Sequence, residues 1–190
     1  MRVIAGEKGG RRLVAPPGSA TRPTSDRVRE AAFSVLESQG LLEGATVWDL
    51  FAGSGAMGIE ALSRGAAHVT FVDSARTAIT AVRANLAKLG YGDREADVVC
   101  AEVLKWAHGL EEGPAPGAGG RLPSLVLADP PYAWRSWPAL LEALGPAAPA
   151  VLIETGEELE LPPSWEAVKV KRYGTTLITL ARCSGERGGR

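Results

Sequence analysis

Two short motifs in this chain have residue types and spacings that could carry chemistry on a nucleoside. The first is the stretch Gly53-Ser54-Gly55-Ala56-Met57-Gly58. Its glycines let the backbone turn sharply and approach a ligand closely, with the N-terminus of the following helix directed at that ligand. Asp49 precedes the stretch by four positions, and its carboxylate would repel a pyrophosphate but attract an ammonium or a sulfonium. The stretch therefore favours S-adenosylmethionine over a dinucleotide as the cofactor.

Two further acidic residues suit the nucleoside end of such a cofactor. Asp73 stands 24 residues after Asp49, at the expected end of the next strand, where a carboxylate can accept hydrogen bonds from both ribose hydroxyls. Glu102 and Val103 follow the expected third strand. There a carboxylate can accept from the adenine amino group while the next backbone N–H donates to the ring. The alternative for Glu102 is a plain helix-capping role.

The second motif is Asp129-Pro130-Pro131-Tyr132, at the expected carboxyl end of the fourth strand. Its prolines fix φ and lack N–H groups, which makes the loop rigid and turns its carbonyls outward. The Asp129 carboxylate and the Pro130 carbonyl can together accept both hydrogens of an exocyclic amine, so that the nitrogen lone pair faces a methyl donor. Tyr132 offers a ring face on which an unpaired base can stack. The alternative is a strand-ending turn, which Asp-Pro sequences commonly form.

The elements that must position these motifs alternate between strand and helix from residue 46 onward. Strands are expected at 46–51, 68–73, 97–101, 124–129 and 150–154, and helices at about 56–64, at 75–89, up to about 108 and within 135–145. Strands that are apolar on both faces and separated by helices indicate a parallel sheet covered on both sides. Residues 167–173 and 175–182 are separated only by Gly174 and predict an antiparallel hairpin. The predicted fold class is α/β.

The first 40 residues are organised differently. Residues 2–6 and 11–15 predict a short β-hairpin, and Thr24 or Ser25 would cap a helix whose apolar positions recur at helical spacing. We expect an N-terminal basic hairpin and helix over 1–40, a catalytic core domain over 41–183 and a flexible tail over 184–190. The glycine- and proline-rich stretch 109–123 predicts a mobile excursion before the fourth strand.

Charge is segregated along this 190-residue chain although the net charge is only −1. Residues 1–30 carry a net charge of +4 and residues 169–190 a net charge of +5, which leaves −10 between them. Such a distribution would suit a polyanion if the two ends meet in space. Two distant cysteines without a Cys/His cluster predict neither a disulfide framework nor a metal site. Because we find no signal peptide and no apolar run long enough to span a membrane, we expect a soluble, cytoplasmic protein.

Several segments together resemble the bacterial RsmD family of Rossmann-like (class I) methyltransferases. They are Arg2 to Gly6, Gly10 to Leu13, Arg22 to Glu30, Asp49 to Gly55, Gly58 to Ala66 and Asp129 to Tyr132. The segment Arg22 to Glu30 is the most specific, because general methyltransferases lack it. The resemblance implies a seven-stranded, mostly parallel sheet of order 3-2-1-4-5-7-6 with an antiparallel last strand, preceded by the N-terminal β-hairpin and helix.

The resemblance also implies an activity. Members of the family transfer a methyl group from S-adenosylmethionine to the N2 amine of guanine 966 in 16S ribosomal RNA, and they act on the assembled small subunit. On this chain the cofactor would contact Asp49, Phe51, Ala52, Gly53, Ser54, Gly55, Asp73, Glu102 and Val103. The target amine would lie at Asp129, Pro130, Pro131 and Tyr132. The expected partner is 16S ribosomal RNA in the small subunit or its assembly intermediate, and we expect a monomer.

A chain of this length leaves no room for a separate target-recognition domain of the kind that reads base edges in duplex DNA. We therefore expect basic residues near the N-terminus to hold phosphates, while the shape of the RNA and its proteins selects the target. The expected RNA-binding residues are Arg11, Arg12, Arg22, Arg27 and Arg29. The alternative, strongest for Arg29, is an ion pair within the fold.

Four other activities stay open from the residues. An adenine-N6 nucleic-acid methyltransferase is the nearest alternative, because Asp-Pro-Pro-Tyr can hold either amine. A protein-glutamine methyltransferase more usually has Asn where this chain has Asp129. An NAD-dependent oxidoreductase is disfavoured by Asp49, and a noncatalytic RNA-binding module is disfavoured by the complete Asp129–Tyr132 loop.

Overall fold

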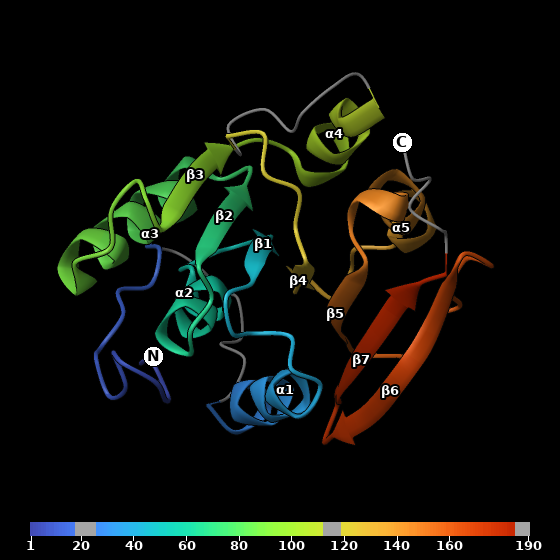
Figure 1. The fold of residues 1–190 in the computed structure, drawn as a ribbon, viewed down its shortest axis with the longest axis horizontal. Helices are drawn as coiled ribbons and strands as arrows, with labels where there is room; N and C mark the ends of the chain where they lie inside the picture. The colour runs from blue at the N-terminus through green and yellow to red at the C-terminus, as the bar shows by residue number, and fades with distance from the viewer. Residues whose placement is uncertain (18–25, 112–118, 185–190) are drawn as a thin grey trace.

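The computed structural model describes residues 1–17, 26–111 and 119–184, which form one sheet with helices on both faces (Figure 1). The seven strands lie in the order β3-β2-β1-β4-β5-β7-β6. β1 to β5 pair in parallel, whereas β7 is antiparallel to both of its neighbours. The predicted α/β class and strand order are confirmed. The strands are β1 (Thr46–Leu50), β2 (His68–Asp73), β3 (Ala96–Cys100), β4 (Leu125–Ala128), β5 (Ala150–Thr155), β6 (Trp165–Tyr173) and β7 (Thr176–Cys183).

The helices form two groups, each enclosing a hydrophobic core against one face of the sheet. α1, α2 and α3 pack on one face, and α4 and α5 pack on the other. β4 and β5 are buried along their whole length, because apolar side chains on both faces are covered. The helices are α1 (Asp26–Ser38), α2 (Ala56–Ser63), α3 (Arg76–Leu89), α4 (Val103–His108) and α5 (Trp137–Leu144), with 3₁₀ turns η1 (Gly109–Glu111) and η2 (Gly145–Ala147).

The N-terminal segment, residues 1–17, reverses direction where the sequence predicts a β-hairpin. Its two arms are bonded to each other: Arg2 and Arg12 form an antiparallel bridge, and the Val3 N–H donates to the Arg11 carbonyl at 2.9 Å. The predicted hairpin is therefore present, although it is short. Other backbone groups of the same segment bond to a helix. The N–H groups of Ile4 and Ala5 donate to the Glu60 carboxylate on α2 at 2.7 and 3.0 Å.

Some predicted features cannot be followed in the structure. The cap positions Thr24 and Ser25, residues 112–118 of the stretch 109–123 and nearly all of the tail lie outside the described residues. In the part of the chain that is described, no helix is both long and apolar enough to span a bilayer.

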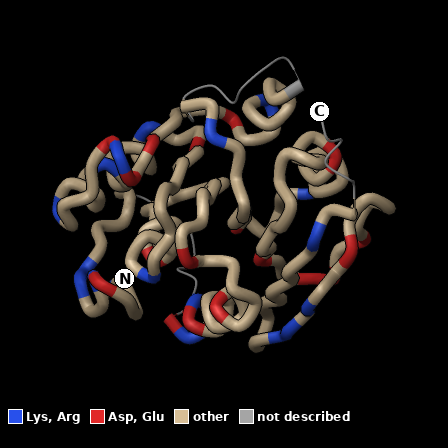
Figure 2. Tube along the Cα trace, in the orientation of Figure 1, with Lys and Arg blue, Asp and Glu red and all other residues tan. Residues whose placement is uncertain are grey.

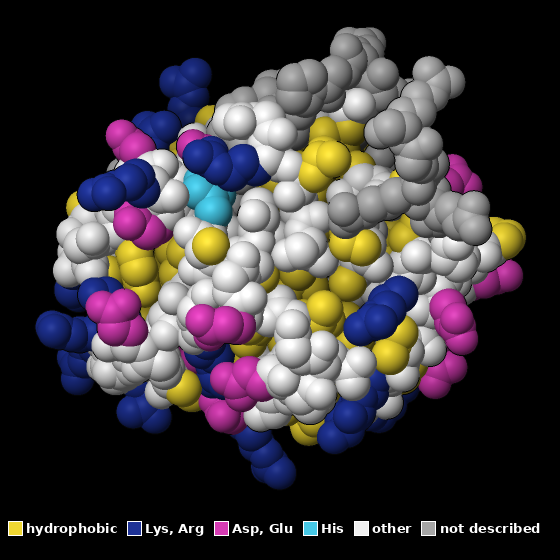
Figure 3. Space-filling view, viewed as in Figure 1, with side chains coloured by type: hydrophobic (Ala, Val, Ile, Leu, Met, Phe, Trp, Pro, Cys, Tyr) yellow, Lys and Arg dark blue, Asp and Glu magenta, His cyan; other side chains and the backbone are white. Residues whose placement is uncertain are grey.

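The basic residues of the N-terminal segment, 1–17, and those of β6 lie at opposite ends of the sheet. The N-terminal segment contacts α2 and α3, and Lys88 on α3 donates to the Arg12 carbonyl at 2.8 Å. β6, which carries Lys169 and Lys171, forms the other edge (Figure 2). Figure 3 accordingly shows Lys and Arg side chains gathered at the left margin and at the lower right. Among the described residues, the basic side chains of the N-terminal segment and those of β6 therefore lie on different edges of the molecule.

Candidate active site

The glycine loop between β1 and α2 turns sharply, and a hydrogen bond joins the start of α2 to a side chain of β1. The Asp49 carboxylate on β1 accepts a hydrogen bond from the backbone N–H of Gly58 at 2.8 Å. Gly53 and Gly55 have φ of +56° and +78°, and Phe51 has φ of +61°. A left-handed conformation costs a bulky residue such as Phe51 roughly 1–3 kcal/mol. The loop is thus a tightly turned, strained segment in which the backbone can approach a ligand closely.

Asp73 connects the glycine loop to the end of β2. Its carboxylate accepts hydrogen bonds from the N–H groups of Gly53 and Ala75, both at 2.8 Å. Asp49, Gly53 and Asp73 therefore lie together at the carboxyl ends of β1 and β2, where the sequence predicts the cofactor.

Three carboxylates converge at this edge of the sheet, those of Asp49, Asp73 and Asp129. Asp49 is only 3% exposed. Burial raises the pKa of Asp49 well above its ordinary value, the Gly58 N–H opposes this rise, and the charges of Asp129 and Asp73 add to it. A positively charged ligand would relieve this mutual repulsion, and its attraction would be strong in a site of low dielectric.

Glu102 acts as the N-cap of α4. Its carboxylate accepts hydrogen bonds from the N–H groups of Leu104 and Lys105 at 3.1 and 2.9 Å. Val103, the first residue of α4, is 2% exposed and packs in the core. The structure thus shows the capping alternative for Glu102, and the adenine contact stays a prediction.

The Asp129–Tyr132 loop leaves the end of β4. The Tyr132 hydroxyl and Thr176 Oγ1 on β7 share a hydrogen bond of 2.9 Å, while the Tyr132 residue stays 44% exposed. The Trp134 N–H donates to the Pro131 carbonyl at 2.8 Å. These bonds hold the loop in place and keep Tyr132 accessible to a ligand.

A pocket of about 230 Å³ adjoins this loop. Its lining comes from Pro130, Pro131 and Tyr132, from Trp134 and Trp137, and from the end of β5 and the residues that follow it. Pockets for drug-sized ligands usually measure about 300–1,000 Å³, so this one suits a single flat ring system. Its aromatic lining suits stacking with a base.

A row of aromatic rings joins the pocket to the glycine loop. The rings of Phe51 and Trp134 meet edge to face with centroids 5.1 Å apart, and those of Trp134 and Trp137 meet likewise at 5.0 Å. The predicted cofactor loop and the predicted amine-binding loop are therefore connected through contacting aromatic rings.

The sequence reasoning missed the contribution of β5. Glu154, Thr155, Gly156 and Glu157 also line the pocket. A usable signal existed, because ligands of doubly wound sheets bind outside the carboxyl ends of the strands and β5 adjoins β4.

The arginines predicted to hold RNA differ in exposure. Arg11 and Arg12 on the N-terminal segment are exposed, as is Arg27 on α1. Arg22 lies outside the described residues. Contact with RNA stays a prediction for these four.

Arg29 requires a correction. It is 1% exposed; its Nη2 lies 3.1 Å from the Asp26 carboxylate and its Nε lies 3.8 Å from that of Glu60. Burial lowers the pKa of Arg29, and the two carboxylates counteract that effect. The predicted RNA contact is replaced by an ion pair within the fold, because α1 turns this residue toward α2.

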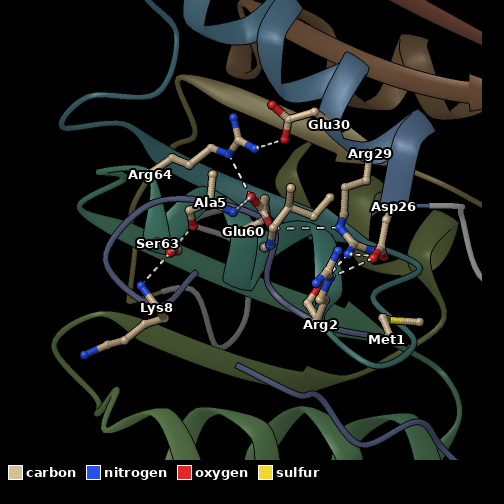
Figure 4. Close-up of polar contacts among 12 residues, drawn as sticks. Met1, Arg2, Ala5, Lys8, Asp26, Arg29, Glu30, Glu60, Ser63 and Arg64 are labelled. Carbon is tan, nitrogen blue, oxygen red and sulfur yellow. Dashed lines mark hydrogen bonds and ion pairs between the residues drawn. The ribbon is translucent and has the colours of Figure 1, made fainter. Parts of the chain in front are cut away.

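Glu60, which pairs with Arg29, also fastens the N-terminal segment to α2 by accepting the N–H groups of Ile4 and Ala5 (Figure 4). Glu60 is fully buried, and its carboxylate also lies 2.7 Å from Arg64 Nε. One turn further along α2, the Ser63 hydroxyl accepts from the Lys8 N–H at 2.9 Å and donates to the Ala5 carbonyl at 2.6 Å. The segment is thereby held by side chains that come from a helix of the core.

Asn85 on α3 links the N-terminal segment to the glycine loop. Its side chain accepts from the Val14 N–H at 2.8 Å and donates to the carbonyls of Val14 and Ser54, each at 2.9 Å. The Ser54 hydroxyl donates in turn to Met1 Sδ at 3.1 Å. The segment that carries Arg11 and Arg12 therefore contacts the predicted cofactor loop directly.

Comparison with known sequences gives matches over nearly the whole chain. The sequence model of a family described as conserved hypothetical protein 95 matches residues 1–182. The putative rRNA methyltransferase YlbH of Bacillus subtilis is 34% identical, over 97% of this chain and 100% of its own. The ribosomal RNA small subunit methyltransferase D of Escherichia coli K12 is also 34% identical, over 95% of this chain and 88% of its own.

Solved structures agree with these matches. The putative methyltransferase yhhF from Escherichia coli has a TM-score of 0.80 at 28% identity and covers 98% of this chain and 99% of its own. The hypothetical protein TTHA0928 from Thermus thermophilus has a TM-score of 0.75 at 26% identity, over 95% and 98% of the two chains. The predicted Rossmann-like methyltransferase fold is confirmed.

Proposed function

The chain belongs to the RsmD family, described as conserved hypothetical protein 95, and on that premise we propose that it methylates the N2 amine of guanine 966 in 16S ribosomal RNA, using S-adenosylmethionine. Methylation of ribosomal RNA is the broader activity that this membership supports, since relatives named for it match along nearly their full length. We also propose that the substrate is the small subunit or its assembly intermediate, and that the protein acts as a monomer.

One observation carries the proposal, namely the convergence of carboxylates from three strand ends beside the Asp129–Tyr132 loop. The charges of Asp73 and Asp129 both raise the pKa of Asp49, so the three carboxylates lie near one another. An adjoining pocket with aromatic walls can take a flat ring. A cation site next to a base site is what methyl transfer from a sulfonium to a base requires.

The residues present fit S-adenosylmethionine. Asp49 supplies negative charge near the glycine loop, Asp73 supplies a carboxylate for the ribose, and Glu102 with Val103 lie where adenine would bind. When bound, the cofactor supplies a methyl group on a positively charged sulfur: the amine lone pair forms the N–C bond, the C–S electron pair stays on sulfur, and the amine then loses one proton.

The chain's own residues position the amine. Asp129 and the Pro130 carbonyl accept its two hydrogens, which turns the nitrogen lone pair out of conjugation with the ring, and the Asp129 carboxylate can take the released proton. Tyr132 stacks on the base, and the neighbouring Trp134 excludes water. Positioning of this kind can lower a barrier by roughly 7–11 kcal/mol.

Asp129→Asn tests the proposal. We expect turnover to fall by at least about 100-fold, because the amide oxygen can still accept one hydrogen of the amine but the neutral amide cannot take the released proton, while affinity for S-adenosylhomocysteine in calorimetry changes less than about threefold. Turnover is measured as labelled methyl transferred to 16S RNA and to small subunits from a strain that lacks the enzyme. Glu157→Gln, at an exposed carboxylate of the same pocket, is the matched control.

Mass spectrometry of the product nucleosides decides between activities. N2-methylguanine supports the proposal, whereas N6-methyladenine supports the adenine alternative. Full activity of Asp129→Asn would contradict the role given to the Asp129–Tyr132 loop. Transfer to small subunits in preference to bare RNA supports the proposed partner.

A further inference from the structure

The end of β5 places a second buried carboxylate beside the Asp129–Tyr132 loop. Glu154, the penultimate residue of β5, is 5% exposed and lines the pocket together with Pro130 and Tyr132. Charged side chains are rarely buried unless they are paired, because removing a charge from water costs free energy. The proposed positioning of the amine uses Asp129 and leaves Glu154 without a role.

The strand register shows how Glu154 lies relative to Asp129. Ala128, the last residue of β4, pairs with Ile153 on β5, and Asp129 and Glu154 are the residues that directly follow this pair. Neighbouring strands are about 4.8 Å apart, which places the two backbones within reach of one small ligand.

Side-chain alternation puts both carboxylates on the same face of the sheet. Leu127 and Leu152 belong to the core under α1 to α3, whereas Ala128 and Ile153 belong to the core under α4 and α5. Because successive side chains point to opposite faces, Asp129 and Glu154 leave the sheet on the same face as Leu127 and Leu152. Asp49, which is paired with Leu127 in register, shares that face.

We infer that Glu154 selects guanine by accepting a hydrogen bond from its N1–H, while Asp129 and Pro130 hold the adjacent N2 amine. This inference rests on the proposed function and names the residue that discriminates between bases. Guanine presents N1–H and N2–H₂ as neighbouring donors on one edge, whereas N1 of adenine is an acceptor. A carboxylate at Glu154 therefore attracts guanine and repels adenine.

Burial of Glu154 strengthens this discrimination. A hydrogen bond to an ionised acceptor is roughly twice as strong as a neutral one, and an unmatched polar group in a buried site is costly. Sites built to bind a donor reject analogues that lack it by factors of about 10⁴–10⁵ in favourable cases. A carboxylate offers about four acceptor positions, so the contact that Glu154 already makes within the protein leaves room for a base.

Glu157 provides a matched control in the same pocket lining. Its side chain is 67% exposed, and its carboxylate lies 3.6 Å from Arg135 Nη2 at the surface. A carboxylate in water contributes little to selectivity because solvent competes for its hydrogen bonds.

The test compares guanine with 2,6-diaminopurine, which keeps the N2 amine but has an acceptor at N1. Each base is placed at the target position of 16S RNA by ligation and assayed with the wild-type protein, Glu154→Gln and Glu157→Gln. We expect the wild-type protein to prefer guanine by at least about 100-fold in kcat/KM. Glu154→Gln should lose most of that preference, because its amide can donate to N1 of diaminopurine, and Glu157→Gln should keep it within about twofold.

The outcomes separate this inference from the proposed function. Wild-type protein that makes N2-methylguanine but accepts both bases equally would overturn the inference, whether or not any variant folds. An unchanged preference in Glu154→Gln, with S-adenosylhomocysteine affinity intact, would also overturn it. Wild-type protein that methylates N6 of adenine instead would remove the proposed function itself, and the inference with it.

Discussion

The carboxylate of Asp49 is held where ionisation is most costly. It is buried, it accepts a hydrogen bond from the Gly58 N–H, and two further carboxylates lie near enough to raise its pKa. Such an arrangement destabilises the protein alone and favours a complex with a cation. A site that binds a sulfonium would gain affinity from this destabilisation, because the ligand removes the repulsion.

Asp49→Asn should therefore have opposite effects on folding and binding. The pKa of Asp49 is raised in the folded state, so the stability that its protonated form contributes is present below about pH 3.8 and is lost as pH rises through the folded pKa. Relative to the wild-type protein, the variant should gain stability in urea unfolding as pH rises from about 4 to 7. Its affinity for S-adenosylmethionine should fall by about tenfold or more in calorimetry. If the difference in free energy of unfolding between the variant and the wild-type protein stays constant from about pH 4 to 7, a raised pKa of Asp49 is contradicted.

The residue scale also shows what a sequence can and cannot reveal. Arg27 and Arg29 look alike in a basic stretch, yet only Arg29 is buried. The spacing indicates burial of Arg29, because Arg29 stands four residues before Phe33 and seven before Leu36, both on the buried stripe of α1. Its partner Asp26 stands three residues earlier on the same helix, a spacing at which ion pairs form. Its partner Glu60 could not be predicted, since Glu60 becomes its neighbour only when α2 packs beside α1.

Among the elements, the N-terminal segment depends on one glycine to lie against α2. Gly6 has φ of +76°, and a Cβ there would stand 1.8 Å from the Ser63 carbonyl oxygen. Gly10 has φ of +81°, but a Cβ there meets nothing within 4 Å. The two glycines share a backbone conformation and differ in their surroundings.

Gly6→Ala should accordingly destabilise the protein far more than Gly10→Ala. We expect about 3 kcal/mol for Gly6→Ala, from backbone strain and steric overlap, and about 1 kcal/mol for Gly10→Ala, from strain alone. Urea unfolding measures both, and limited proteolysis reports release of residues 1–17. Equal losses for the two variants would show that contact with α2 is unimportant.

Prediction at the element scale succeeded where periodicity was strong. The strands and helices between residues 46 and 183 fall within one or two residues of their expected ranges, because apolar runs and glycine punctuation define them. The N-terminal hairpin is present but short, because some of its backbone groups bond to Glu60 and Ser63, which lie more than fifty residues away, and not to the opposite arm. The local sequence pattern cannot predict such distant partners.

At the scale of the whole molecule, charge is divided between two edges of the sheet. Arg11 and Arg12 lie on the N-terminal segment beside α3, and Lys169 and Lys171 lie on β6 at the far edge. A nucleic acid bound to the first edge does not need to contact the second. Each edge can thus be altered while the other serves as a control for net charge.

We predict that Arg11→Glu combined with Arg12→Glu weakens RNA binding and flattens its salt dependence. Loss of two phosphate contacts should reduce the slope of log affinity against log salt by about 1–2. Lys169→Glu combined with Lys171→Glu makes the same change in net charge and should leave the slope nearly unchanged. Filter binding across a salt series measures both pairs. If the two double variants reduce the slope of log affinity against log salt equally, RNA binding depends on the overall charge of the protein and not on the N-terminal segment.

The attachment of residues 1–17 has a consequence for the order in which the molecule is completed. Asn85 and Lys88, which hold Val14 and Arg12, lie 71 and 76 positions further along the chain. Loops of that length are slow to close, so we expect residues 1–17 to be among the last of the described residues to become fixed. Until they are, Ser54 lacks its contact with Met1, so the glycine loop reaches its final surroundings only after residues 1–17 have docked.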